Sequence, residues 1–186
     1  EAFGGEILGV AGISGCGQKQ LLEAIAGLQL ANEGSSIRFF PDEGGEKQLL
    51  GKTPRQIREL GVSLSFVPED RLGMGLVGNM DIVDNMMLRS YRKGKGFFLR
   101  RSGPKHLAED IIKQLEVVTP GASTPVRRLS GGNVQKVLVG REIASSPKVL
   151  MAAYPVRGLD INSSYTIYNL LTKLLKIHTN SCCLLW

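Results

Sequence analysis

The sequence lacks any long, uninterrupted hydrophobic run. Its most apolar stretch, residues 148–156, is interrupted by Tyr154 and Pro155 and falls short of the ~18 residues that a spanning helix needs. The start of the chain also lacks a basic segment leading into a long apolar one, which is the pattern of an export signal. These absences predict a chain that does not cross a membrane and that works in the cytoplasm.

Cysteine is scarce, with three residues in the whole chain. Cys16 lies in a glycine-rich stretch, while Cys182 and Cys183 are adjacent, which is poor geometry for a disulfide between them. A disulfide framework is therefore excluded. The cysteine usage favours a reducing compartment.

Neither sign of charge dominates, because 23 Lys and Arg residues face 17 Asp and Glu residues, giving a formal net charge of +6. This balance permits contact with nucleic acid or an anionic membrane face without indicating either. Hydrophobic residues at 42% and charged residues at 22% are typical of globular proteins, and 186 residues suffice for one sizeable core. We expect a compact folded chain.

Apolar residues follow strand spacing in some segments and helix spacing in others. Strands are predicted at residues 7–11, 37–40, 62–67 and 149–153, and helices at 54–60, 130–146 and 163–177, with another helix after residues 12–20. Residues 72–118 are mostly helical in pattern and resemble an inserted lobe, and no strand is predicted after residue 177. Strands that alternate with helices predict an α/β fold with a parallel sheet and a ligand at the carboxyl ends of the strands.

The glycine-rich segment after the first strand has the spacing of a phosphate-binding loop, in which backbone N–H groups and a helix N-terminus hold phosphate. The usual pattern has lysine and then a hydroxyl residue where this chain has Gln18 and Lys19. Lys19 cannot replace its neighbour, because one step along a helix turns the side chain by roughly 100°. We expect Lys19 to reach solvent, because an ammonium buried without a carboxylate is costly. The alternative is that its ammonium lies where magnesium would sit. The candidate nucleotide-binding residues are Gly12, Ser14, Gly15, Cys16, Gly17, Gln18, Lys19 and Gln20.

Residues 129–136, Leu-Ser-Gly-Gly-Asn-Val-Gln-Lys, resemble the signature motif of ATP-binding-cassette (ABC) proteins. The resemblance implies that the serine, the glycine N–H groups and the helix N-terminus face the γ-phosphate of a nucleotide held by an opposing domain. A serine-capped helix start without a ligand is the alternative for this segment, as a ligand-free turn is for the glycine-rich loop. The candidate residues are Leu129, Ser130, Gly131, Gly132, Asn133 and Gln135.

Residues 148–160 resemble the Walker B strand and the D-loop of the same family. The resemblance places the magnesium-holding aspartate at Ala153 and the glutamate that polarises the attacking water at Tyr154, so both carboxylates are missing. Asp160 keeps the D-loop carboxylate. Its alternative is an acid at a helix N-terminus, which the helix dipole favours.

Residues 66–71, Phe-Val-Pro-Glu-Asp-Arg, occupy the place of the family's Q-loop, with Glu69 instead of the usual glutamine. This phrase, the signature motif and the Arg-Gly-Leu-Asp at 157–160 resemble the second cassette of the fused two-cassette ATPases of simple-sugar and nucleoside importers. The resemblance runs from about residue 5 to 171. Missing from it are a leading antiparallel strand pair and a later strand with a switch histidine, and His106 and His178 are expected on the surface.

The resemblance implies a P-loop NTPase-like fold: a parallel sheet core flanked by helices, with an inserted helical lobe, truncated at both ends. Residues 1–186 are expected to be one nucleotide-binding domain, with the lobe at 72–145 and the α/β core at 5–71 and 146–177. The strand that ends at Ala153 is expected beside the one that ends at Ala11. A phosphate loop and a Walker B-like strand must meet at one sheet edge to share a ligand.

The implied function is an ABC-type ATPase that couples ATP binding and hydrolysis to the import of sugars or nucleosides. This cassette is expected to hydrolyse ATP weakly or not at all, to have no catalytic residue or metal site of its own, and to lend its signature motif to a partner cassette. ATP is the expected cofactor, and Mg²⁺ is left open because its ligand positions hold Lys19 and Ala153. The implied partners are a second cassette, permease subunits and an extracytoplasmic solute-binding protein, at the cytoplasmic face of the membrane.

The alternative function is a basic, nucleic-acid-associated ABC-type ATPase. Its best support is the positive charge balance of the chain. In addition, Tyr91, Phe97 and Phe98 are interleaved with basic side chains between residues 89 and 101, and this segment could bind phosphates and bases. A solvated loop is the more common role of such a run, and nucleic acid is not the expected partner. The basic residues are Arg89, Arg92, Lys93, Lys95, Arg100 and Arg101.

Overall fold

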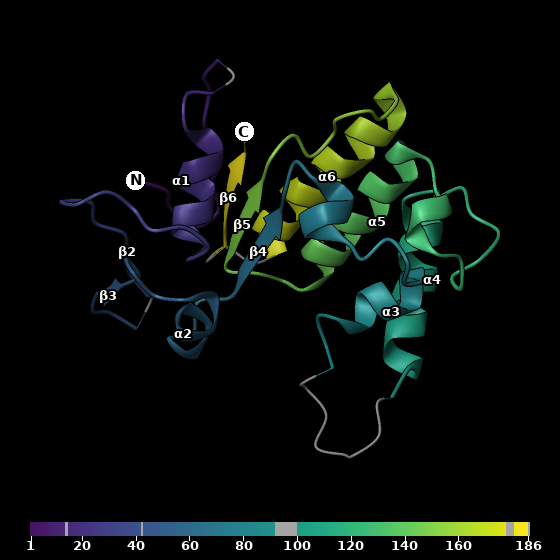
Figure 1. Cartoon of the computed structure of the whole chain (residues 1–186), viewed down its shortest axis with the longest axis horizontal. Helices are drawn as coiled ribbons and strands as arrows, with labels where there is room; N and C mark the ends of the chain where they lie inside the picture. Colours follow the sequence, from purple (N-terminus) through teal and green to yellow (C-terminus); the bar gives the residue numbers. More distant parts are fainter. Residues whose placement is uncertain (14, 42, 92–99, 178–180, 186) are drawn as a thin grey trace. The chain divides into compact units, whose positions relative to one another are not determined.

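The computed structural model describes residues 1–13, 15–41, 43–91, 100–177 and 181–185 (Figure 1). By its internal contacts the chain divides into two compact units. The first comprises Glu1–Phe66, Pro147–Ala153 and Leu174–Trp186, and the second comprises Val67–Ser146 and Tyr154–Lys173. The expected division into a lobe at 72–145 and a core around it stays a prediction.

A four-stranded sheet in the order β1-β6-β5-β4 forms the centre of the first unit. β1 (Ile7–Gly9) pairs in parallel with β6 (Cys182–Leu185), and β6 pairs in parallel with β5 (Val149–Ala152). β4 (Leu64–Val67) follows in the order, and β6, β5 and β4 are the neighbouring arrows of Figure 1. Every residue of β5 is buried, as expected for a strand covered on both faces. The three predicted strands are confirmed to within two residues at each end.

β6 corrects two predictions from the sequence. No strand is predicted after residue 177, yet Cys182–Leu185 forms one, and it lies between β1 and β5, which are predicted to be neighbours. The four residues, Cys-Cys-Leu-Leu, are too few to show a period. A short strand between two parallel neighbours needs only apolar residues, and Cys183 and Leu184 are indeed buried.

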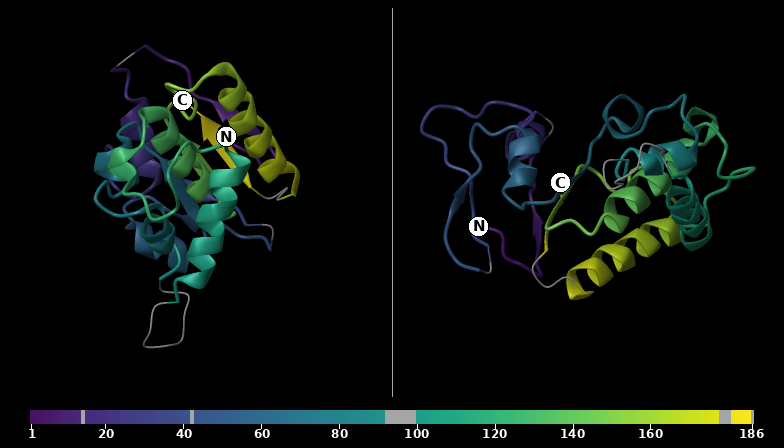
Figure 2. Two further views of the ribbon diagram at one scale, coloured as in Figure 1. Left: turned by 90° about the vertical axis from the view of Figure 1, so that its right-hand side faces the viewer. Right: turned by 90° about the horizontal axis from the view of Figure 1, so that it is seen from below.

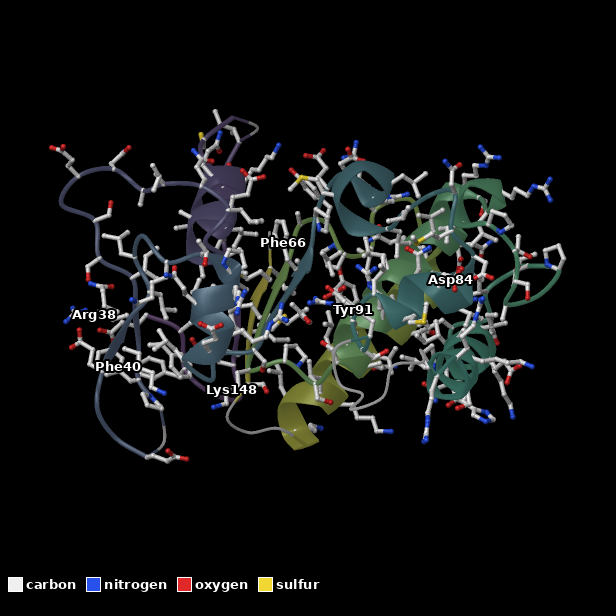
Figure 3. The ribbon with its side chains drawn as sticks, turned by 60° about the horizontal axis from the view of Figure 1, so that its bottom comes forward. Arg38, Phe40, Phe66, Asp84, Tyr91 and Lys148 are labelled. Atoms are coloured by element: carbon white, nitrogen blue, oxygen red, sulfur yellow. The ribbon has the colours of Figure 1, made fainter. Side chains whose placement is uncertain are left out.

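A small antiparallel sheet and a short helix also belong to the first unit. β2 (Arg38–Phe39) confirms the strand predicted at 37–40, and its partner β3 (Lys47–Gln48), two residues long, is not foreseen. α2 (Pro54–Glu59) begins after Thr53 as predicted, because the Thr53 side chain and Gln56 form a reciprocal capping box. The Arg38 guanidinium lies 6.0 Å from the centre of the Phe40 ring (Figure 3). The Lys148 ammonium lies 5.8 Å from the centre of the Phe39 ring.

The core of the first unit is apolar and draws on helices, strands and loops. α1 (Gln18–Ile25) contributes Leu22 and α2 contributes Ile57, and both side chains are fully buried. They pack with side chains from β5 and β6. This packing fixes α1 against the sheet and so positions the glycine-rich loop that precedes α1. The cluster consists of Leu22, Ala26, Leu49, Ile57, Val62, Val149, Met151 and Leu184.

The second unit is helical. It contains the π-helical turn η1 (Arg71–Gly75), α3 (Ile82–Met87), α4 (Ser102–Gln114), the 3₁₀ turn η2 (Val126–Arg128) and α5 (Gly131–Ala144). α6 (Ile161–Ile177), the longest helix of the described chain, lies in this unit up to Lys173 (Figure 2). α3 packs against α4, α4 against α5, and α5 against η1. The helices predicted at 130–146 and 163–177 are confirmed.

Charged side chains take part in the core of this unit. Glu142 of α5 is fully buried and forms ion pairs with Arg89 and with Arg141, the latter at 2.8 Å. Arg141 also donates a hydrogen bond of 2.7 Å to the Gly75 carbonyl, which ties α5 to the end of η1. Burial and, secondarily, the nearby Arg89 charge lower the pKa of Arg141 to about 10. Within the described residues, no helix is both long and apolar enough to span a membrane.

Candidate functional site

The glycine-rich loop joins β1 to α1 in the first unit. Gly15 and Gly17 have φ angles of +89° and +94°, a region that side chains with a Cβ rarely adopt, so the turn into α1 depends on glycine. Gly17 precedes α1, and no side chain among the described residues caps that helix start. The first N–H groups of α1 therefore remain available as donors at the loop. Ser14, predicted to bind nucleotide, lies outside the described residues.

Gln18 fills the inside of this loop. The residue is 5% exposed, and its Nε2 donates a hydrogen bond of 3.2 Å to the Ile13 carbonyl. A Cβ at Gly12 would lie 2.2 Å from the same Nε2, so the amide occupies the space next to that glycine. The residue at the usual lysine position is thus a neutral group folded into the loop.

Lys19 lies on another side of α1. Its side chain is 53% exposed, and its ammonium lies 3.8 Å from a Glu23 carboxylate one turn along the helix. This position agrees with the expectation that Lys19 reaches solvent. An exposed i,i+4 pair of this kind contributes only a few tenths of a kcal/mol, roughly 0.3–0.5.

The position that corresponds to the family's Walker B aspartate offers no side-chain oxygen to a magnesium ion. Because β1, β6 and β5 are parallel, the carboxyl ends of β1 and β5 lie at one edge of the sheet, with β6 between them. At that end of β5, Ala153 is buried and carries no oxygen ligand, although Mg²⁺ requires oxygen donors. In the described part of the chain, no group of three or more His, Cys, Asp or Glu side chains could hold a metal ion.

The signature segment forms the start of α5 in the second unit. Ser130 is the N-cap residue, and its Oγ accepts hydrogen bonds from the backbone N–H and the side-chain Nδ2 of Asn133, at 3.4 and 2.9 Å. The Asn133 Oδ1 in turn accepts from the Val118 N–H at 3.0 Å. The two hydrogen bonds from Asn133 to Ser130 use the lone pairs of the Ser130 hydroxyl oxygen. The hydroxyl hydrogen of Ser130 therefore keeps the capacity to donate to a ligand. Ser130 itself is exposed.

Gln135 holds α5 against the segment that follows β5. Its side chain is 1% exposed, and Nε2 donates to the Pro155 carbonyl at 2.8 Å. Its Oε1 is buried and has no partner among the described residues. In the same segment Tyr154 has a φ of +48°, and the Arg157 guanidinium lies 5.7 Å from the centre of its ring. In the structure, Gln135 therefore makes its side-chain hydrogen bond to a residue of this same chain.

Asp160 caps α6. Its Oδ1 accepts from the Ser163 N–H at 2.9 Å and its Oδ2 from the Ser163 hydroxyl at 2.6 Å. These hydrogen bonds lower the pKa of the Asp160 carboxyl below its usual value. The alternative role for this residue, an acid at a helix N-terminus, is thus the one that the geometry displays.

Glu69, at the Q-loop position, accepts a hydrogen bond from the Arg157 guanidinium. The neighbouring Arg71 donates to the Gly131 carbonyl at the start of α5 and to the Arg157 carbonyl. Neither arginine is predicted from the sequence as a site residue. Arg71 belongs to the Pro-Glu-Asp-Arg phrase at 68–71, and this association is the one signal that could have indicated it.

A comparison with protein-family models matches residues 2–155 to the model described as ABC transporter. Among curated relatives, the guanosine import ATP-binding protein NupO of Bacillus subtilis is 39% identical over 86% of this chain and 30% of its own length. The xylose import ATP-binding protein XylG of Moorella thermoacetica is 37% identical over 91% of this chain and 32% of its own length. This chain therefore spans about a third of the length of these relatives.

Solved structures agree on the fold. A dimeric ATP-binding cassette in a post-hydrolysis state, bound to ADP and phosphate, covers all of this chain with a TM-score of 0.77 and 22% identity, and this chain covers 76% of it. The predicted P-loop NTPase-like α/β fold is confirmed. With a family match over most of its length, the chain belongs to the ABC transporter family, as an ATPase domain whose similar relatives include sugar and nucleoside import ATP-binding proteins.

Proposed function

We propose that this chain is the second, degenerate ATP-binding cassette of an importer of simple sugars or nucleosides, and that its signature motif completes a nucleotide site on a partner cassette. The carrying observation is the contrast between its two motif regions. In the glycine-rich loop a neutral amide, Gln18, is folded in where the family has a lysine. At the start of α5 the serine cap and the glycine pair keep the signature pattern.

Magnitudes support weak nucleotide binding at the glycine-rich loop. The lost lysine removes an interaction of ~4 kcal/mol for unit charges ~4 Å apart at an effective dielectric of 20. Hydrogen bonds from loop N–H groups to a charged phosphate are each worth roughly 1.5–3 kcal/mol, and these donors remain. ATP is then held by N–H groups of the glycine-rich loop and of the start of α1, without a lysine side chain at position 18.

The rate of ATP hydrolysis at this loop should be very low, even where ATP binds. A positioned general base contributes typically 10²–10⁴-fold to the rate, and Tyr154 stands where the family has its glutamate. Ala153 also removes the carboxylate that would hold the metal. The catalytic lysine, aspartate and glutamate would come from a partner cassette paired head to tail with this one.

The remaining parts of the assembly follow from this function. The transporter would contain permease subunits and an extracytoplasmic solute-binding protein, with this chain at the cytoplasmic face of the membrane. The relatives include proteins named as guanosine, xylose and ribose import ATP-binding proteins, which supports the substrate class of nucleosides and simple sugars. Much of the basic segment considered for the alternative, nucleic-acid-associated function falls at residues 92–99, outside the described residues.

The test compares substitutions in the two motif regions of the assembled transporter. Ser130→Arg places a large cation at the start of α5 and should abolish ATP turnover, because preorganised donors at developing phosphate charge are a major source of catalysis. Gln18→Ala should leave turnover within about threefold, since the loop contributes no charge to chemistry. Equal losses from the two variants, or vigorous hydrolysis by this cassette alone, would contradict the proposal.

A further inference from the structure

Arg71 joins two backbone segments that lie far from each other in sequence. Its Nη1 donates a hydrogen bond of 2.8 Å to the Gly131 carbonyl, and its Nη2 donates one of 2.5 Å to the Arg157 carbonyl. Gly131 is the first residue of α5, directly after Ser130, and Arg157 precedes the cap of α6. All of these residues belong to the second unit. One planar group therefore fixes the signature segment to the D-loop segment.

The signature glycines make this contact possible. A Cβ at Gly131 would lie 3.1 Å from the Arg71 Nη1, and a Cβ at Gly132 would lie 3.1 Å from the Gly158 carbonyl oxygen. Both distances are tighter than ordinary contacts of a Cβ. The glycine pair thus lets the guanidinium and the D-loop backbone approach the first turn of α5.

Two charged side chains near Arg71 have opposite effects on its guanidinium. Burial and, secondarily, the charge of Arg157 lower the pKa of Arg71. The Glu69 carboxylate pairs with Arg157 and offsets that second positive charge. Arg71 itself donates to two neutral carbonyls, which receive stronger hydrogen bonds from a charged donor than from a neutral one.

We propose that Arg71 is a positioning residue for the signature motif. By fixing the first turn of α5 against residues 157–158, it sets the direction in which Ser130 and the adjacent N–H groups face the nucleotide of the partner cassette. This inference rests on the proposed function of the signature motif. Two-point bonding by a rigid, planar guanidinium restrains rotation of the helix start, and a lysine ammonium lacks that fork geometry.

The main experiment measures ATP hydrolysis by the complete transporter that carries this cassette. Arg71→Ala should lower kcat roughly 10- to 100-fold, the scale expected when a catalytic group is misplaced by about 1 Å. KM for ATP should change less than about threefold, because an interaction made mainly in the transition state affects kcat. Arg71→Lys should recover less than half of the lost rate. Arg55→Ala, which removes an exposed arginine of α2 that pairs with Glu59, is the matched control and should hydrolyse normally.

A double-mutant cycle separates positioning from general stability. If Arg71 acts through Ser130, adding Arg71→Ala to Ser130→Ala should lower kcat by less than about threefold, far below its effect alone. Amide hydrogen exchange at residues 132–135 should also be faster in Arg71→Ala than in the unaltered protein or in Arg55→Ala. The inference would be overturned if the kcat losses of Arg71→Ala and Ser130→Ala multiplied in the double variant. Unchanged amide exchange or normal ATP turnover in Arg71→Ala would also overturn it. Failure of both Arg71 variants to fold would overturn it too, by assigning Arg71 to the fold itself.

The outcome for Ser130→Arg tells the two proposals apart. If that variant hydrolyses ATP normally, the proposed function of the signature motif fails, and the positioning role fails with it. If Ser130→Arg abolishes turnover while Arg71→Ala hydrolyses normally, the proposed function stands and the positioning role alone is wrong.

Discussion

The two glycine-rich segments of this chain use glycine for different physical reasons. In the loop before α1, Gly15 has a φ of +89°, yet a Cβ there would meet no described residue within 4 Å apart from its chain neighbours. At the start of α5, Gly131 and Gly132 are helical, but a Cβ on either would lie 3.1 Å from another atom. The loop needs glycine for its backbone conformation and the signature segment needs it for space. Substitution of glycine should therefore have different effects in these two segments, although their sequences are similar.

Gly27 combines both reasons and should be the most sensitive glycine of this comparison. Its φ is +73°, and a Cβ there would lie 2.3 Å from the Lys52 carbonyl oxygen and 3.0 Å from the Ile57 side chain. Gly27→Ala should lower the free energy of unfolding by roughly 2–5 kcal/mol, from a left-handed residue at ~1–2 kcal/mol plus overpacking at ~1–3 kcal/mol.

Denaturant unfolding of the two variants checks this sum. Gly15→Ala, with the conformational cost alone, should lose only about 1–2 kcal/mol. A Gly27→Ala variant no less stable than Gly15→Ala would mean that the Lys52 carbonyl moves away at little cost. The distinction between space and conformation would then fail at this position.

Gly132 isolates the need for space. Gly132→Ala should change the free energy of unfolding by less than about 1 kcal/mol, because better helix propensity offsets the tight approach to the Gly158 carbonyl. Gly132→Val should lose about 1–3 kcal/mol more, since extra methyl groups overpack the contact. Thermal or urea unfolding of this pair measures the step. Equal stability of the two variants would remove the packing role assigned to Gly132.

Gly103 is expected to give the smallest effect. It is a helical residue of α4, and a Cβ there would meet no described residue within 4 Å apart from its chain neighbours. The next residue is Pro104, whose ring disfavours the helical conformation for a preceding residue that carries a Cβ. Gly103→Ala should therefore change the free energy of unfolding by less than about 1 kcal/mol, because this clash opposes the better helix propensity of alanine. A larger change in urea unfolding would contradict this balance.

The sequence predicts the elements that have a clear period or a clear cap. Thr53 and Ser130 begin α2 and α5 as expected, because an N-cap hydroxyl is a local signal that the structure uses directly. β6 and β3 are not predicted, because two to four residues are too few to show a hydrophobic period. The order of strands is also not predictable from local patterns, because it depends on pairing between segments far apart in the sequence. The sequence prediction places β5 next to β1 because it does not include β6.

The chemistry of the candidate site is less predictable than its location. Replacement of the usual lysine by Gln18 is readable from the sequence, but the folding of its amide against the Ile13 carbonyl depends on the rotamer and the loop conformation. Arg71 is one of many arginines, and only the fold brings it to the Gly131 carbonyl, 60 residues away along the chain. The assigned roles of the nucleotide-binding and signature residues stay predictions.

The position of β6 between β1 and β5 has a consequence for synthesis on the ribosome. β1 emerges first, but its partner in the sheet is the last strand described, almost the whole chain later. At ~5–20 residues per second, roughly ten to thirty-five seconds pass before that partner exists. During this time β1 and the glycine-rich loop cannot take their final place in the sheet. The helical unit, whose last residues are made before β6, has the opportunity to form first during translation.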